Sequence, residues 1–398
     1  MNGATGKVVY VLGAGFSIPA GAPPQADILG EIFDLGDHDQ RIAAAKTRLR
    51  RFLLKDLHVN KEDATKVALE DIYTPIDRCI ADGTSLRGRP HIQVQKLRGE
   101  IGYLISQAIA ERVSNRLSTE QGSSAYIDRF AEYLVGLAAH KATLAKGSND
   151  ATAAKQYDPF SIICLNWDIL LDNALHNALL REHAGSGDYD PFGVVDYCCY
   201  ISSLNATDTR IRTGLWSLGC RGYNVKLLKL HGSMNWLQCP NCQRLFVEFG
   251  EKRGILERLG ADECRHCKKY GHSNLLQGSL VMPTFLKDLS NFQIKLVWQN
   301  AGVELMEAKG LVFIGYSLPH ADFEFRQLLT RMIWRDAPVD VVLFEGETEK
   351  SKRDYKDVSE RYRQFFSGHD LTFHPKGVEE YTRRISITKR SRERLRES

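Results

Sequence analysis

The chain has 398 residues, a length typical of two or three packed units of about 100–200 residues each. Its 53 Lys and Arg residues against 49 Asp and Glu residues give a net charge of +4, and 43% of the residues are hydrophobic. This composition excludes intrinsic disorder over most of the length, and no apolar run approaches the ~20 residues of a membrane span. The start resembles neither a signal peptide nor a transit sequence, so we expect a cytoplasmic protein.

Five short apolar runs predict strands of a parallel sheet, because strands buried on both faces read as continuous β-branched segments. They are Lys7–Leu12, Ser161–Leu165, Val225–Leu230, Gly310–Ile314 and Val339–Phe344. A sixth candidate strand, Asp370–Phe373, precedes a predicted last helix at Val378–Arg384. Helical patterns separate several of these strands, so we predict an α/β fold with a Rossmann-like, doubly wound parallel sheet.

The sequence predicts four units along the chain. Residues 1–35, 156–238 and 273–382 form the Rossmann-like domain, and residues 36–155 form an all-helical insertion between its first two strands. Residues 239–272 form a small module between the strand regions Val225–Leu230 and Ser279–Met282, and residues 383–398 form a basic C-terminal tail. The insertion is core packing, a lid or an oligomer surface, and its sequence does not discriminate among these. One buried helical face is predicted at Leu97, Ile101, Leu104, Ile105 and Ile109.

The charge of the chain is unevenly distributed. Between Arg383 and Arg396 the chain carries seven basic residues and one acidic residue, Glu393, so this segment contributes +6 and the rest of the chain sums to −2. The basic residues are Arg383, Arg384, Lys389, Arg390, Arg392, Arg394 and Arg396. Such a segment is a solvated helix end, a subunit contact or a weak nucleic-acid tether, of which the solvated end is the commonest. The body of the chain is therefore not a general binder of polyanions.

The first predicted strand runs directly into Gly13-Ala14-Gly15, and a helical pattern resumes at Gln25–Phe33. Glycines in such a turn let backbone N–H groups approach a phosphate, and the following helix N-terminus favours the negative charge. The Ser17 hydroxyl adds a donor for the same anion. A Gly-Ala-Gly turn after a strand is about as often a tight turn that binds no ligand. The position after the first strand of a doubly wound sheet favours the anion site.

Polar side chains follow two further predicted strands. Asn166 and Asp168 follow the second strand, and His231 follows the third. Ligands of open α/β sheets lie outside the carboxyl ends of the strands, so we expect these side chains to converge on whatever the glycine turn binds. A single His is ordinarily a structural hydrogen-bonding residue. Its expected position near Asn166 and Asp168 favours an acid–base role here.

Four of the nine cysteines form two CxxC pairs with 21 residues between them. They are Cys239, Cys242, Cys264 and Cys267. The separation slightly exceeds the usual ~15–20 residues of a zinc ribbon, but four thiolates suit a tetrahedral structural site. We predict that they bind a structural Zn²⁺ with no open coordination position. The alternative is four free buried thiols.

The motifs in their chain order resemble the sirtuins, the silent-information-regulator family. The order is strand–GAGxS, NxD, HG, the paired CxxC motifs and Gly315-Tyr316-Ser317-Leu318, and it covers Val8 to about Phe373. Each motif alone is modest, whereas five in the same order are specific. The resemblance implies a sirtuin-like fold with a zinc-ribbon module, and NAD as the substrate.

The resemblance also implies which residues bind NAD. The predicted cofactor-binding residues are Gly13, Ala14, Gly15, Ser17, Gly315, Ser317 and Glu345. The glycine turn and its serine would line the pyrophosphate, and the second glycine and serine would face the phosphate and ribose. Glu345 is assigned from its position instead, because acids at strand ends of dinucleotide-binding folds bond the ribose.

The catalytic residues implied by the resemblance are Asn166, Asp168 and His231. Asn166 would position a water or a ribose hydroxyl, Asp168 would hold the nicotinamide carboxamide, and His231 would be the general base toward a ribose hydroxyl. Nicotinamide leaves as a neutral molecule and generates an oxocarbenium-like ribose, which either an acyl-lysine oxygen or water then attacks.

Three departures from the protein-deacylating sirtuins favour water as the acceptor. Phe16–Pro24 lacks the Asp, Phe and Arg of their GIPDFR-like segment, and Val281–Lys287 stands in place of the VxFGE stretch that pairs with substrate peptide. Pro283 removes a strand donor at that edge. The large helical insertion is the third departure. All three resemble the sirtuin-like effectors of prokaryotic antiviral defence, which hydrolyse NAD and often form assemblies gated by a partner.

We therefore predict an NAD⁺ hydrolase that releases nicotinamide and ADP-ribose as a regulated effector of antiphage defence. We expect a homo-oligomer, with a HerA-like ATPase as a candidate partner. One alternative is an NAD-dependent protein deacylase or ADP-ribosyltransferase. A second alternative, from another class, is a non-catalytic sensor of NAD or ADP-ribose within an assembly.

Overall fold

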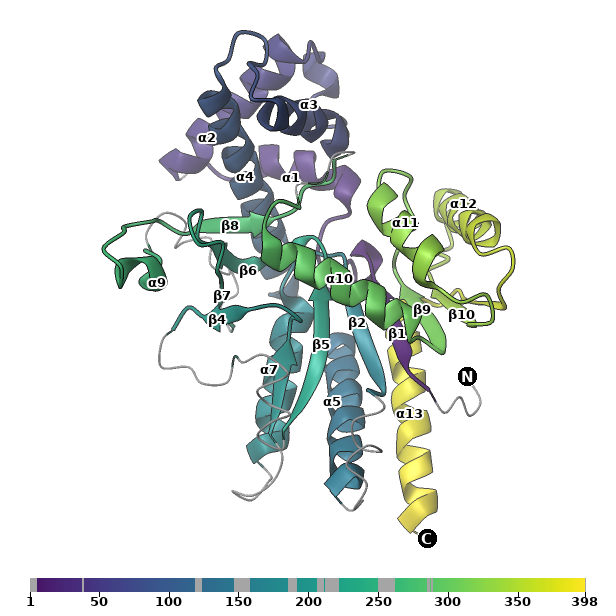
Figure 1. The fold of residues 1–398 in the computed structure, drawn as a ribbon. Coiled ribbons are helices and arrows are strands. Elements are labelled where there is room, and N and C mark those ends of the chain that lie inside the picture. Colours follow the sequence, from purple (N-terminus) through teal and green to yellow (C-terminus); the bar gives the residue numbers. More distant parts are fainter. Residues whose placement is uncertain are drawn as a thin grey trace.

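The computed structural model describes residues 6–37, 39–118, 124–146, 158–184, 192–205, 211, 222–249, 262–284, 287 and 289–397. Residues 285 and 286 of the stretch Val281–Lys287 lie outside these ranges. Within them, seven strands form one parallel sheet in the order β11-β10-β9-β1-β2-β5-β3 (Figure 1). The strands are β1 (Val8–Leu12), β2 (Phe160–Cys164), β3 (Gly193–Asp196), β5 (Tyr223–Lys229), β9 (Gly310–Ile314), β10 (Val339–Val342) and β11 (Leu371–His374).

The sheet confirms the predicted doubly wound α/β architecture. Six of the strands lie within two residues of the apolar runs that predicted them. The side chains of β2 and β9 are buried throughout, as expected of strands covered on both faces. The seventh strand, β3, is not predicted from the sequence. It has four residues and, in the described part of the chain, pairs with β5 alone at the edge of the sheet, so its pattern is too short to recognise.

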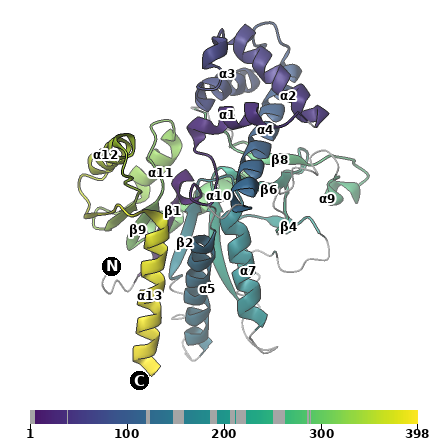
Figure 2. The ribbon, with the colours of Figure 1, turned by 180° about the vertical axis from the view of Figure 1, so that it is seen from behind.

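Helices cover both faces of the sheet. On one face α5 (Ala125–Lys146), α7 (Leu170–Ala184) and α13 (Gly377–Glu397) run side by side, and on the other lie α10 (Phe292–Met306) and α11 (Phe323–Met332) (Figures 1 and 2). A further helix, α12 (Glu349–Phe365), packs on β9 through Tyr362, whose ring centroid lies 5.3 Å from that of Phe313.

Helix α5 packs on the sheet and supports the turn that follows β1. The ring of Phe130 meets that of Tyr10 edge to face at 5.3 Å, and the buried Tyr126 hydroxyl donates to the carbonyl of Phe16 at 2.5 Å. The last helix of the predicted insertion is therefore part of the core of the sheet. The predicted boundaries of the four units stay predictions.

A second hydrophobic core lies beyond the carboxyl edge of the sheet (Figure 1). It belongs to residues 25–117, which we call the cap, with helices α1 (Ile28–Asp34), α2 (Gln40–Arg51), α3 (Leu69–Asp82) and α4 (His91–Leu117). The predicted apolar face is confirmed, since its five residues in α4 are all buried. Met234 and Met282 join this core from outside the cap, so the cap packs against the rest of the molecule.

A smaller sheet lies beside the cap in the order β4-β7-β6-β8. Its strands are β4 (Ile201–Ser203), β6 (Gly232–Gln238), β7 (Leu245–Val247) and β8 (Gln277–Leu280), and the short helix α9 (Arg265–Lys268) lies between β7 and β8. The cysteine module is flanked by the antiparallel pair β6 and β8. The sequence-based flanking pair, Val225–Leu230 with Ser279–Met282, is therefore wrong, because β5 belongs to the large sheet.

The C-terminal segment continues a helix. The sequence predicts a last helix at Val378–Arg384 followed by a separate tail, but α13 extends from Gly377 to Glu397. Side chains after Ile387 lie outside the described part of the chain. Among the residues that the structure describes, no helix combines the length and apolar character of a membrane span.

Candidate functional site

The polar motifs meet at the carboxyl edge of the large sheet. Strand β1 lies at its centre, and the chain adds β2 on one side and later β9 on the other, so this is the switch point where ligands bind in doubly wound folds. The glycine turn follows β1, Asn166 and Asp168 follow β2, His231 follows β5 and Gly315 follows β9.

A cavity of about 110 Å³ lies among these loops, and we call it the switch-point cavity. Five predicted residues line it, which are Ala14, Ser17, Asn166, Asp168 and His231. The cap adds walls from Gln25, Glu70 and Ile109. The structure thus brings the three predicted catalytic residues together with part of the glycine turn.

The remaining five predicted cofactor residues are not among the described residues that line this cavity. They are Gly13, Gly15, Gly315, Ser317 and Glu345. The side chains of Ser317 and Glu345 are exposed at the ends of β9 and β10. Their assignment to an NAD site stays a prediction.

The three glycines are explained by the packing of two loops against each other. The N–H of Gly15 donates to the carbonyl of Gly315 at 2.8 Å, and the N–H of Gly13 donates to that of Ile314 at 3.0 Å. A Cβ atom on Gly15 would lie 2.7 Å from Cα of Gly315, which also has a φ of +62°. Larger residues would therefore push the loops apart. This tight contact needs no ligand, and it occupies two of the N–H groups that a phosphate would use.

Asn166, Ser17 and Asp168 form one buried hydrogen-bonded group. The Asn166 Nδ2 donates to the carbonyl of Gly13 at 2.9 Å and to the Ser17 Oγ at 3.1 Å, so it ties the β2 loop to the glycine turn. The Ser17 hydroxyl also hydrogen-bonds the Asp168 carboxyl. Asp168 Oδ1 accepts from the N–H of Leu170 at 3.1 Å at the start of α7. Burial raises the pKa of Asp168, although Lys229 and Ser17 oppose that shift.

A fully buried ion pair supports the Asp168 loop from below. Lys229, the last residue of β5, contacts Asp172 Oδ2 at 3.0 Å and donates to the backbone carbonyl of Asp168 at 2.5 Å. The Tyr197 hydroxyl donates to Asp172 Oδ1 at 2.7 Å. Burial lowers the pKa of Lys229, but Asp172, Cys164 and Asp168 together outweigh burial, so this pKa is raised overall. The pair is not predicted from the sequence, because neither residue belongs to a recognised motif.

Each ring nitrogen of His231 faces a polar atom of another loop. Nδ1 lies 3.0 Å from the carbonyl oxygen of Leu165, and since a carbonyl only accepts, Nδ1 carries a proton. Nε2 faces Asp322 Oδ1 at 3.4 Å. The ring centroid of Trp298, from α10, lies 6.4 Å away.

Asp322 and Lys287 line the cavity but are not predicted from the sequence. Lys287 Nζ lies 3.0 Å from Asp322 Oδ1, and the Tyr316 hydroxyl donates to Asp322 Oδ2 at 2.9 Å. Burial raises the pKa of Asp322, but His231 and then Lys287 outweigh it, so this pKa lies well below its usual range. One local feature points to a role for Asp322 outside its own helix. Asp322 is the N-cap residue of α11 yet makes no side-chain capping bond, so its carboxylate serves another purpose.

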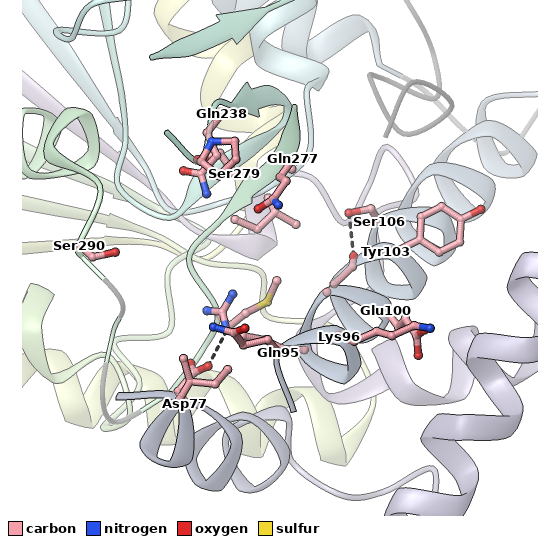
Figure 3. A pocket seen from close by; sticks show the side chains of 18 of the residues that line it. Asp77, Gln95, Lys96, Glu100, Tyr103, Ser106, Gln238, Gln277, Ser279 and Ser290 are labelled. Atoms are coloured by element: carbon pink, nitrogen blue, oxygen red, sulfur yellow. Dashed lines mark hydrogen bonds and ion pairs between the residues drawn. The ribbon is translucent and has the colours of Figure 1, made fainter. Parts of the chain in front are cut away.

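A much larger groove, of about 1660 Å³, runs between the cap and the small sheet. Figure 3 shows Asp77, Gln95 and Lys96 on the cap side, facing Gln277 and Ser279 of β8. Lys287 lines both this groove and the switch-point cavity, so the two spaces meet at that side chain.

The four predicted metal ligands are brought together. The sulfur atoms of Cys239, Cys242, Cys264 and Cys267 all lie within 4.8 Å of one another. Two of the separations are 3.7 Å, close to the ~3.8 Å edge of a tetrahedron with zinc–sulfur bonds of about 2.3 Å. The cysteines are therefore positioned to bind a zinc ion, with no position left for substrate.

A scan against protein-family models finds no match, and a search of curated proteins finds none either. Among solved structures, similar chains include a serine-to-alanine mutant of a Sir2 homologue in complex with ADP-ribose. That chain has a TM-score of 0.41 and 13% identity, over 98% of this chain and 95% of the other. A complex of a Sir2 homologue with NAD has a TM-score of 0.40 and 13% identity, over 98% of this chain and 91% of the other. Sir2Tm bound to a propionylated peptide has a TM-score of 0.37 and 13% identity, over 96% of this chain and 93% of the other. Because these scores and identities are low, we draw the function from the site itself.

Proposed function

We propose that this protein binds NAD at the switch-point cavity and hydrolyses its nicotinamide–ribose bond. The observation that carries the proposal is the convergence of Asn166, Asp168 and His231, with Ala14 and Ser17, in one cavity at the carboxyl ends of three neighbouring strands. The order of sequence motifs shared with sirtuins and the location at the switch point support NAD as the ligand.

Each polar residue has a defined role in the proposed reaction. The bond between ribose C1′ and the nicotinamide nitrogen breaks with its electrons leaving on nicotinamide, and the water oxygen bonds to C1′. Nδ2 of Asn166 is engaged by the glycine turn, so its Oδ1 accepts from the water. Nδ1 of His231 is engaged by Leu165, so Nε2 takes up the proton that the attacking water loses. Asp168 holds the nicotinamide carboxamide.

The lining of the cavity favours water over a peptide as the acceptor. Pro283 lines the cavity three residues after the end of β8, and β8 is the edge strand of the small sheet as described. A peptide that extended this sheet would meet Pro283, which has no N–H to donate.

The size of the cavity supports a regulated enzyme. About 110 Å³ is well below the roughly 300–1,000 Å³ of pockets that hold small-molecule ligands. The cap closes one side, where Gln25 Nε2 donates to Glu70 Oε1 at 2.7 Å. NAD therefore enters when the cap wall moves, which gives a partner or a second subunit a means of control.

A second candidate function is transfer of ADP-ribose or an acyl group to an acceptor molecule. The large groove favours it, because the groove reaches the switch-point cavity at Lys287 and offers space for an acceptor. The role in antiphage defence, the homo-oligomer, the HerA-like ATPase partner, nucleic-acid contact by the tail and the cytoplasmic location stay predictions.

Product analysis tests the proposal. Purified protein is incubated with NAD, alone, with an acylated peptide and with lysate of phage-infected cells, and the products are separated by chromatography. We expect nicotinamide and ADP-ribose in equal amounts, independent of peptide. An acyl-ADP-ribose product would select the transferase instead. NAD binding by calorimetry with no cleavage under any condition would select a sensor.

A further inference from the structure

The contacts of His231 identify another residue that acts in the proposed reaction. Three separate loops meet at Asp322: its own loop before α11, the turn between β5 and β6 that carries His231, and the segment after β8 that carries Lys287. All three side chains are largely buried, with exposed fractions of 8%, 13% and 3% for Asp322, His231 and Lys287. Charged groups interact more strongly when they are buried away from water, so Asp322 and Lys287 affect how His231 gains a proton.

The carboxylate of Asp322 is held in a fixed orientation. Its Oδ2 accepts from the buried Tyr316 hydroxyl, and Tyr316 is itself fixed because its carbonyl accepts from the Tyr362 hydroxyl at 2.9 Å. Oδ1 then faces Nε2 of His231 at 3.4 Å and Nζ of Lys287 at 3.0 Å. The low pKa of Asp322 keeps the carboxylate charged.

The opposite side of the imidazole is fixed as well. Nδ1 donates to Leu165 in the β2 loop, and Nε2 is the nitrogen that faces Asp322. A neutral ring would direct its Nε2 lone pair at a carboxylate, which is repulsive, whereas a protonated ring would be attracted. The 3.4 Å separation is longer than the usual 2.7–3.2 Å hydrogen bond, as is common before substrate binds.

We propose that Asp322 is the positioning residue for His231, orienting the ring and balancing the charge that it gains when Nε2 takes up a proton. Lys287 shares the same carboxylate oxygen and so limits the negative charge that His231 experiences. The proposal rests on the proposed function for the identity of the reaction, whereas the pairing itself is independent of it.

The test compares Asp322→Asn with a matched control. A second His–Asp pair, His374 Nε2 and Asp340 Oδ1, has the same 3.4 Å separation and lies outside the cavity, so Asp340→Asn is the control. We expect Asp322→Asn to lower kcat on the order of 100-fold, the range of a general base, with KM for NAD changed less than about threefold. Asp340→Asn should leave kcat within about twofold of the original protein.

A spectroscopic readout separates this inference from the proposed function. In protein labelled with ¹⁵N-histidine, the ring nitrogens of His231 should shift in Asp322→Asn and stay in place in Asp340→Asn, whether or not NAD is cleaved. Tyr316→Phe removes only the hydroxyl that holds the carboxylate, so it should give a smaller change of the same kind should Asp322→Asn fail to fold. Unchanged His231 signals in a folded Asp322 or Tyr316 variant overturn the pairing. Shifted signals in a protein that never cleaves NAD support the pairing and contradict the proposed function.

Discussion

Individual buried side chains hold the loops of this site in place. Lys229 and Asp172 have exposed fractions of 0% and 1%, and together they join the end of β5 to the start of α7. Because Lys229 also holds the carbonyl of Asp168, the pair fixes one of the proposed catalytic residues from beneath. A buried pair of this kind is costly to break, since either partner alone is an uncompensated charge.

Lys229→Met should therefore destabilise the protein by about 3–5 kcal/mol, because it leaves the Asp172 carboxylate buried without a counter-ion. Urea denaturation gives the free energy of unfolding. The control is Arg78→Met, which removes an exposed pair with Asp82 and should cost less than about 1 kcal/mol. An equal, small loss for both variants would show that Lys229 does not stabilise the fold as described.

At this scale the sequence predicted those residues whose position follows from the sheet alone. Asn166, Asp168 and His231 come directly after recognisable strands, and parallel strands bring their carboxyl ends to one edge. Asp322 and Lys287 lie in loops whose paths depend on packing of α11 and the small sheet. No local pattern contains that information, although an uncapped N-cap aspartate is a clue once the helix is known.

Among the elements, the strands of the large sheet were predictable because each is a continuous apolar run. The pairing of β6 with β8 was not, since β6 carries polar residues and is nonetheless almost entirely buried. One helix of the cap, α4, was recognisable from the spacing of its apolar face, whereas the place of the cap over the carboxyl edge depends on contacts of Met234 and Met282 with the cap core. The cap therefore supplies walls to a site whose motifs lie elsewhere in the sequence.

The hydrogen bond between Gln25 and Glu70, two cap residues that line the cavity, should oppose NAD binding. Gln25→Ala removes the hydrogen bond to Glu70, whose net contribution is about 0.5–1.5 kcal/mol, so the dissociation constant for NAD should fall by roughly two- to tenfold. Calorimetry measures that constant. Lys66→Ala, which removes an exposed pair with Asp63 elsewhere on the cap, is the control and should change nothing. Weaker binding in Gln25→Ala would mean that this side chain contacts NAD and does not close the site.

Over the whole molecule, the described residues form two large hydrophobic cores and a third small one around the cysteines. In the described part of the module the small core includes Leu237, Phe246 and Leu276, and so small a core does not order a module unaided. Arg265 connects the module to β4 through the carbonyls of Ser203 and Leu204. A metal ion is therefore expected to supply the missing stability.

Metal analysis of the purified protein should find about one zinc ion per chain. Cys264→Ser should lose the zinc and lower the melting temperature, while far-UV circular dichroism changes little because the large sheet does not depend on the module. Cys79→Ser, which alters a cysteine outside the cluster, should keep the zinc. Protein that contains no zinc when purified without chelators would contradict the assignment.

The central claim is that the switch-point cavity cleaves NAD, and the most direct measurement is nicotinamide release by Asn166→Ala beside the unchanged protein. Loss of the side chain that accepts from the water should reduce release at least ~100-fold, in a variant whose zinc content and circular dichroism match the original. The same rate of release from folded Asn166→Ala would show that the reaction occurs elsewhere, and would contradict this account.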